Sequence, residues 1–115
     1  MYNHMVAGTG LSEAEVDRVF RALSDATRRD ILRRTLEVGA SVSQLAVAYD
    51  MSFAAVQKHV AVLEGAGLVT KQRRGRERVV RGDPVALLEV SALLERYEQI
   101  WRARVGRLDV LFSED

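Results

Sequence analysis

The sequence contains no cysteine and only two histidines, His4 and His59. Without cysteine the chain can form neither a disulfide nor a metal site with thiolate ligands. Neither histidine has a carboxylate at a spacing that would complete a catalytic pair. The chain also lacks a glycine-rich phosphate loop, a nucleophile next to a base and a carboxylate pair placed by a motif. We therefore expect no enzymatic activity.

Long apolar runs are absent as well. No stretch approaches the roughly 20 apolar residues that span a bilayer. The first ten residues show neither the basic start nor the apolar run of a signal peptide. These absences predict a cytoplasmic protein. With 115 residues, of which 48% are hydrophobic, the chain is expected to fold as one domain with its own core.

Positive charge is concentrated in one segment. Residues 52–81 carry seven basic and two acidic side chains, a net charge of +5, which leaves −4 for the rest of a chain whose formal charge is +1. A basic surface on an otherwise acidic body favours a polyanionic partner. A solvated run of charge is the alternative, and the pattern of the surrounding helices argues against it.

The first half of the chain predicts three helices. We expect residues 1–10 to form a mobile arm and residues 11–115 to form the folded domain. A capping box of Ser12 and Glu15 begins a helix that ends near residue 23, and a second helix is predicted over about 26–37. Ile31, Leu32 and Leu36 are expected on the inner face of the second helix, and Gly39 as its C-terminal cap. A third, short helix is predicted over 42–48, begun by a capping box of Ser41 and Gln44.

A turn at Asp50 and Met51 then precedes a helix of different character. Its apolar residues Val56, Val60 and Leu63 recur at spacings of four and three, and Gly65 and Gly67 are expected to end it. Short side chains on the opposite face let a backbone approach the major groove, where an amide or ammonium group meets base edges. That face carries Phe53, Ala54, Gln57, Lys58 and Ala61.

The segment from Leu68 to Arg81 predicts a β-hairpin. Two extended runs flank Arg74-Gly75-Arg76, where glycine permits the positive φ of a tight turn. Arginines at the tip of such a hairpin reach DNA phosphates or the minor groove. An ordinary exposed hairpin, kept soluble by its charge, is the alternative.

One long helix is predicted at the end of the chain, over residues 84–112. Asp83 and the only proline, Pro84, form its expected start. At about 42 Å it is longer than a small domain needs to close its core, and Gly106 weakens it. We favour a subunit interface over packing inside one monomer. The apolar stripe comprises Leu87, Val90, Leu94, Tyr97, Trp101, Val105 and Leu108, with Leu111 or Phe112.

Five motifs in this order resemble winged-helix repressors of the ArsR type. The resemblance covers nearly everything from Leu11 to Phe112. It implies a mainly α fold with a small β-hairpin wing, a winged helix-turn-helix. It also implies a homodimer joined through the first and last helices, which binds an inverted-repeat operator and represses transcription until a signal releases it. The motifs are FRALSDATRRDIL from Phe20, SVSQLA from Ser41, VQKHVAVL from Val56, GAGLV from Gly65 and RGR from Arg74.

Residue by residue, the resemblance implies three sets of contacts. The recognition helix would contact DNA through Ser52, Phe53, Ala54, Gln57, Lys58 and His59, with Ser52 and His59 near phosphate. The wing would do so through Arg73, Arg74, Arg76 and Arg78. The dimer interface would contain Val16, Phe20, Leu94, Tyr97, Trp101, Val105 and Leu108.

The sequence also departs from the family. Metal-sensing members carry a cysteine pair on the short helix, where this chain has Leu45 to Asp50, and the last helix has glutamates but no histidine. We therefore expect no metal and no cofactor. Gly82 replaces an apolar residue that commonly closes the wing, which predicts a looser wing.

The sequence predicts two partners and leaves several alternatives open. The expected partners are double-stranded DNA and a second copy of the chain. A small apolar effector between Tyr97 and Trp101 of the two subunits is a further hypothesis. Arg28 either contacts phosphate or lies on a solvated helix face, and His59 contacts either phosphate or another helix. The alternative function is a protein-interaction module without specific DNA binding, which has no need for five arginines between Arg73 and Arg81.

Overall fold

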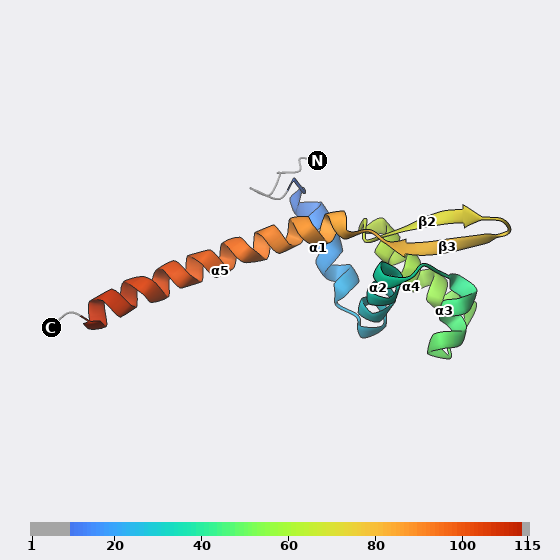
Figure 1. Ribbon diagram of the computed structural model, residues 1–115, viewed down its shortest axis with the longest axis horizontal. Helices are drawn as coiled ribbons and strands as arrows, with labels where there is room; N and C mark the ends of the chain where they lie inside the picture. The colour runs from blue at the N-terminus through green and yellow to red at the C-terminus, as the bar shows by residue number, and fades with distance from the viewer. Residues whose placement is uncertain (1–9, 114–115) are drawn as a thin grey trace.

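A computed structural model describes residues 10–113 of the chain. Figure 1 shows the helices between residues 13 and 65 gathered at the base of a β-hairpin, with the last helix projecting to the opposite side. The expected fold class, mainly α with a small wing, is confirmed. The arm predicted for residues 1–10 lies, except for Gly10, outside the described residues. The elements are α1 (Glu13–Leu23), α2 (Ala26–Glu37), β1 (Ala40–Ser41), α3 (Val42–Tyr49), α4 (Phe53–Gly65), β2 (Val69–Arg74), β3 (Glu77–Gly82) and α5 (Pro84–Ser113).

The helices begin where side chains can satisfy their free N–H groups. In both predicted capping boxes the serine hydroxyl accepts from the backbone N–H three residues later, at 3.1 Å for Ser12 and for Ser41. The carboxylate of Glu15 accepts from the backbone N–H of Ser12 in return, and these hydrogen bonds with Ser12 hold the pKa of Glu15 below its ordinary value. Ser52 caps α4 in the same way, which fixes the direction of that helix after the turn.

The hairpin belongs to a three-stranded antiparallel sheet in the order β1-β3-β2. Strands β2 and β3 are joined by a two-residue turn at Gly75 and Arg76, and Gly75 adopts the expected positive φ of 61°. Strand β1 was not expected from the sequence. It pairs Ala40 with Val80 and Ser41 with Val79, and so attaches the base of the wing to the segment between α2 and α3.

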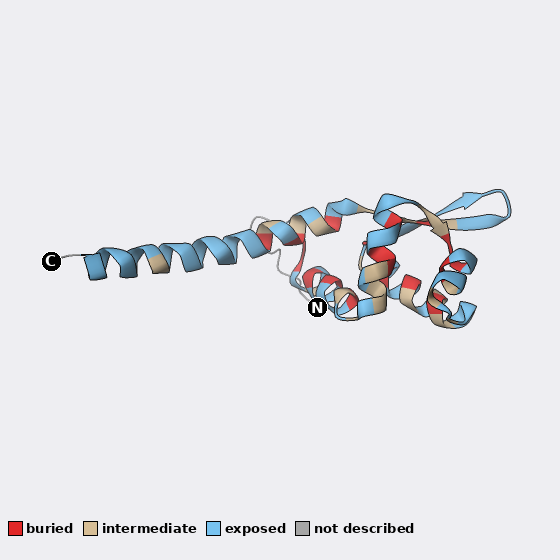
Figure 2. Cartoon of the chain, turned by 60° about the horizontal axis from the view of Figure 1, so that its bottom comes forward, coloured by how far each residue is buried: buried red, intermediate tan, exposed pale blue. Residues whose placement is uncertain are grey.

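The core lies where α1 to α4 meet the base of the wing. Figure 2 places the buried residues there and shows the outer part of α5 largely exposed, with no buried residue along it. Residues from five elements fill the centre: Val19, Ile31, Leu45, Val56, Val60, Leu63 and Val80 are all nearly inaccessible. The base of α5 joins this core through Ala86, Val90 and Leu93. The helix-turn-helix and the wing are therefore held rigidly together, whereas α5 extends away from them.

Two glycines have a different role from the one predicted. Gly39 does not have positive φ, and Val38, which ends α2, is extended. A Cβ on Gly39 would lie 2.7 Å from Cγ1 of Val79, and a Cβ on Gly82 would lie 2.6 Å from Cγ of Leu36. Both glycines therefore permit close approach between α2 and β3. The predictions of a Gly39 cap and of a wing loosened by Gly82 are wrong.

Leu36 itself was predicted to be on the inner face of α2, but its side chain is 41% exposed. Its neighbour Thr35 is buried instead, and its hydroxyl donates to the carbonyl of Ile31 at 2.8 Å. Leu36 lies at the margin of the core, where Gly82 passes close to it. The hydrophobic face of α2 is thus rotated slightly from the one that the apolar residues alone predict.

Candidate nucleic-acid interface

The turn between α3 and α4 sets the orientation of the helix predicted to contact DNA. Asp50 adopts the left-handed conformation, with φ of 52°, and the N–H of Met51 donates to the carbonyl of Ala46 at 3.0 Å. This tight turn allows α4 to bury Val56, Val60 and Leu63 completely against the other helices. The opposite side of α4 is consequently presented to solvent.

The predicted recognition residues lie on that outward side. Ser52, Phe53, Ala54 and Lys58 are exposed, and Gln57 is half-buried. They occupy the first two turns of α4, which is the part of a recognition helix that contacts base edges in helix-turn-helix proteins. The structure therefore brings five of the six residues predicted for this helix to one accessible surface.

The sixth, His59, is half-buried and contacts Arg28 of α2. Nη1 of Arg28 lies 3.4 Å from Nδ1 of His59, and because a guanidinium only donates, Nδ1 is the acceptor. The same arginine donates to the carbonyls of Ala22 and Arg21 at the end of α1. Arg28 thus joins α1, α2 and α4. His59 thus makes the contact with another helix that was one of its two alternatives. Arg28, expected either at phosphate or on a solvated helix face, instead joins three helices.

The register of the wing sorts its arginines by face. Residues directly opposite in an antiparallel pair point to the same side, and alternate residues along a strand share a side. Arg73 pairs with Arg78 and Lys71 with the buried Val80, so these side chains lie on the face that continues toward the core and α4. Arg74 pairs with Glu77 on the other face.

Helix α4, the start of α3 and the wing enclose a groove of about 490 Å³. Phe53 and Gln57 line one side of the groove, and Lys71, Arg76 and Arg78 line the side formed by the wing. Lys71 is largely covered and lies 3.9 Å from Glu64, which holds it between β2 and α4. Glu77 also lines the side formed by the wing, so the groove combines an amide and an aromatic ring with a wall of three cationic side chains and one carboxylate.

The residues predicted for the dimer interface fall into two groups. Val16 is buried in the core of its own chain, so it is not accessible to a partner, and that assignment is wrong. Phe20 and the α5 residues Leu94, Tyr97, Trp101 and Leu108 are between 40% and 61% exposed, and Val105 is partly exposed. Beyond Leu93, the described part of α5 buries no side chain in its own domain.

Sequence reasoning missed a polar cluster that fastens α3 to α2. The hydroxyl of Tyr49 donates to Oδ2 of Asp30 at 2.5 Å, and Arg33 and Arg34 also bond that carboxylate. The bond from Tyr49, followed by those from the arginines, holds the pKa of Asp30 below its ordinary value. Burial and the same bond raise the pKa of Tyr49 to about 12. No spacing rule could find this cluster, because Asp30 and Tyr49 are 19 residues apart.

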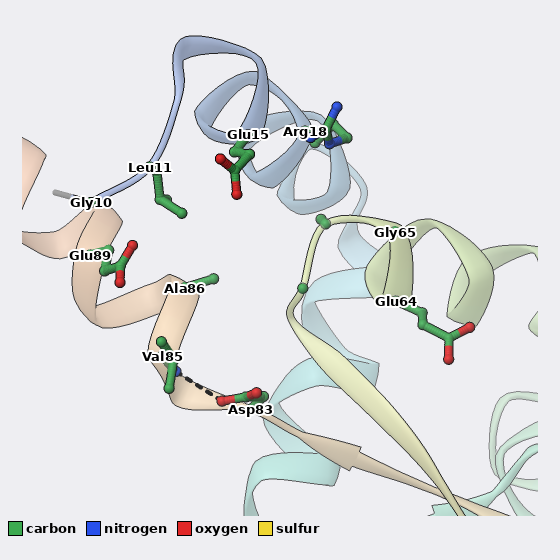
Figure 3. A pocket seen from close by; sticks show the side chains of 12 residues that line it. Gly10, Leu11, Glu15, Arg18, Glu64, Gly65, Asp83, Val85, Ala86 and Glu89 are labelled. Atoms are coloured by element: carbon green, nitrogen blue, oxygen red, sulfur yellow. Dashed lines mark hydrogen bonds between the residues drawn. The ribbon is translucent and has the colours of Figure 1, made fainter. Parts of the chain in front are cut away.

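A second hollow, of about 470 Å³, lies where α1, the end of α4 and the start of α5 meet (Figure 3). Its acidic side chains include Glu15 and Asp83, which already accept hydrogen bonds from the N–H groups of Ser12 and Val85. Among residues 10–113 no group of three or more histidine, aspartate or glutamate side chains is arranged to hold a metal ion. Nor does any described helix have the length and apolarity needed to cross a membrane.

A helix-turn-helix with an exposed recognition helix, flanked by a basic wing, defines the class of winged helix-turn-helix DNA-binding regulators. Comparison with known proteins agrees. A helix-turn-helix domain family matches residues 23–72. The HTH-type transcriptional regulator Rv2034 of Mycobacterium tuberculosis is 36% identical over 99 residues, which cover 85% of this chain and 90% of the relative.

Solved structures identify the family. An ArsR-like transcriptional regulator from Rhodococcus is 34% identical with a TM-score of 0.80, covering 96% of this chain and all of the other. A homodimeric winged helix-turn-helix DNA-binding domain from Mycobacterium bovis is 27% identical with a TM-score of 0.60, covering 76% and 82%. The chain belongs to the ArsR family of transcriptional regulators and carries its DNA-binding winged helix.

Proposed function

We propose that this regulator is a dimeric repressor that binds an inverted-repeat operator and is released by a signal other than a metal ion. The observation that carries the proposal is the groove between α4 and the wing, with Phe53 and Gln57 of the recognition helix on one side and a predominantly basic wall on the other. As a DNA-binding protein it would act in the cytoplasm, where a bacterial-type regulator meets its chromosome. The absence of thiolate ligands from the sequence supports a non-metal signal.

The pairing of Arg73 with Arg78 supports DNA binding over a protein-interaction module. Like charges directly opposite across two strands destabilise a hairpin. Neither arginine forms an ion pair with a described residue, so the repulsion is not relieved within the described chain. A phosphate placed between the two guanidinium groups would relieve it, because each can donate to phosphate oxygens. A hairpin that served only as a protein scaffold would gain nothing from this pair.

The exposed stripe of α5 supports a homodimer. From Leu94 to Phe112, beyond the buried Val90, its apolar residues recur at spacings of three, four, four, three and four, which is an 11-residue repeat. This repeat corresponds to 3.67 residues per turn, close to the 3.6 of an ideal helix, so the stripe stays on one side of a nearly straight helix. A second copy of the same helix is the simplest partner for such a stripe. The solved Mycobacterium bovis domain that resembles this chain is homodimeric.

Two such subunits would place their recognition helices in successive major grooves, about 34 Å apart. Gln57 and Lys58 would contact base edges, Ser52 phosphate, and the wing arginines the flanking backbone. The apolar surface around Tyr97 and Trp101 is where a small apolar effector would act, since a ligand there would alter the distance between the two recognition helices. A Trp101 fluorescence titration that stays flat across apolar candidates would contradict the effector hypothesis.

The test is selection of duplexes from a randomised library, followed by fluorescence anisotropy of the enriched sequence at several salt concentrations. We expect an imperfect inverted repeat, two chains per duplex and a steep fall of affinity with salt. A random duplex of equal length serves as the control, and it should bind at least a thousandfold more weakly. Equal, weak binding to both duplexes would refute sequence-specific operator binding and favour the protein-interaction module.

A further inference from the structure

Phe53 occupies an unusual position for a large apolar side chain. It is the first residue of α4, its side chain is 56% exposed, and it lines the groove opposite Arg76 and Arg78. A single exposed apolar residue is ordinary on most surfaces. Phe53 differs because it stands on a basic surface, at the start of the helix whose first residues contact base edges. Next to it Ala54 is also exposed and leaves room for close approach.

The major groove offers one apolar group to such a side chain. Base edges there present hydrogen-bond donors and acceptors, except for the C5-methyl group of thymine. An aromatic ring gains free energy by covering a methyl group and would lose free energy by covering a polar base edge. The wall of the groove formed by the wing carries Arg76 and Arg78 beside Glu77, with Lys71 deeper in, and its net positive charge matches the phosphates on either side of the base.

Gln57 fixes where that thymine should lie. Phe53 and Gln57 are four residues apart on the same side of α4, about 6 Å along the helix axis, and both line the groove. Glutamine forms paired hydrogen bonds with N6 and N7 of adenine. Because successive base pairs are about 3.4 Å apart, the methyl group covered by Phe53 should belong to a thymine within about two base pairs of that adenine.

We propose that Phe53 is a specificity-determining residue that contacts the C5-methyl group of one thymine in each half-site. The proposal rests on the operator binding proposed above and adds to it a base, a chemical group and a position. Phe53 contributes apolar contact, Ala54 leaves the space for it, and Gln57 supplies the neighbouring hydrogen bonds. The half-site should therefore contain thymine and adenine close together, each recognised by a different side chain of the same helix.

The test replaces each thymine of the selected operator in turn by deoxyuridine, which removes only the methyl group. For the unmodified protein we expect one position per half-site at which affinity falls about fourfold, and about 15-fold when both half-sites are changed. Phe53→Ala should bind both duplexes equally at that position and keep its responses elsewhere. Phe53→Leu should retain most of the effect, because it keeps an apolar side chain there.

Val47→Ala is the matched control, because Val47 is 84% exposed on α3 and does not line the groove. It should behave like the unmodified protein in every duplex, and circular dichroism should show the same fold for all variants. The proposal is overturned if no thymine responds, or if Phe53→Ala loses the same affinity as the unmodified protein on deoxyuridine substitution. A failure of operator binding itself shows earlier and separately, as no enriched duplex in the selection.

Discussion

Replacing Arg78 by glutamate should stabilise the folded protein and weaken its binding to DNA. In the register of the wing, Arg78 lies directly opposite Arg73, with Lys71 two residues before Arg73 on the same face. Glutamate there would convert a repulsive cross-strand pair into an attractive one. Cross-strand charge pairs contribute roughly 0.2–1 kcal/mol, so we expect a gain of about 0.5–1 kcal/mol in the free energy of unfolding at low salt. The melting temperature should rise by about 2–4 °C.

The same change removes one phosphate contact from each subunit. The slope of log Kd against log salt concentration should fall by about two units for a dimer, and every sequence should lose affinity, random duplexes included. Scanning calorimetry at 50 mM and 500 mM salt measures the first effect, which should nearly vanish at the higher concentration. Anisotropy over the same salt range measures the second. If Arg78 had a purely structural role, its substitution would not raise the free energy of unfolding and weaken DNA binding at the same time.

Arg74→Glu is the matched control, since it makes the same charge change one residue from Arg73. Arg74 lies opposite Glu77 on the other face, so the substitution replaces an attractive pair by a repulsive one. It should lower the melting temperature and reduce the salt slope less than Arg78→Glu does. If Arg78→Glu instead destabilised the fold, the assignment of the two faces would be wrong. If it stabilised the fold but left the salt slope unchanged, the wing would not contact phosphate through Arg78.

Three further predictions concern other parts of the fold. Gln57→Ala should reduce discrimination at one base pair per half-site by about 1–3 kcal/mol, measured with single-base operator variants, and Val38→Ala should not change it. Gly82→Ala should lower the free energy of unfolding, measured by urea titration, by about 1–3 kcal/mol, because a Cβ there would lie 2.9 Å from the backbone nitrogen of Leu36. Gly65→Ala is the control and should not lower it, because the space around Gly65 is open. The pKa of Asp30 is held below its ordinary value of 3.8, so its contribution to stability is present above about pH 4 and is lost as the pH falls through the lowered pKa. Tyr49→Phe should therefore lower the melting temperature at pH 7 and flatten its fall on acidification, while an unchanged acid profile would show that Tyr49 does not act through Asp30.

The sequence predicted local features well because their causes lie within a few residues. Each serine cap is completed by a partner three residues later, and the turn of the hairpin is marked by Gly75, so both are visible in a short window. The buried stripe of α4 follows from helical periodicity, and it fixed the exposed side on which Phe53 and Gln57 lie. The fold class was implied by the resemblance of five motifs, in their order along the chain, to winged-helix repressors.

Features that depend on distant residues could not be predicted in the same way. An apolar stripe shows that a face is buried but not by what, so Val16 was assigned to a partner although it packs in its own core. The contact between Arg28 and His59 joins residues 31 apart. Strand β1 has two residues, too few to show an alternating pattern. Gly39 was predicted to cap α2 and Gly82 to loosen the wing, because only the packed structure shows how closely α2 approaches β3.

The central claim is that two recognition helices of one dimer occupy successive major grooves on the same side of the DNA. Inserting base pairs between the half-sites of the selected operator tests it most directly, with affinity and stoichiometry measured for insertions of about five and about ten base pairs. We predict that the half-turn insertion reduces affinity to that of a single half-site, because it places the second half-site on the opposite side of the duplex. Unchanged affinity with two bound chains after that insertion would show that the subunits bind independently, and would contradict the account.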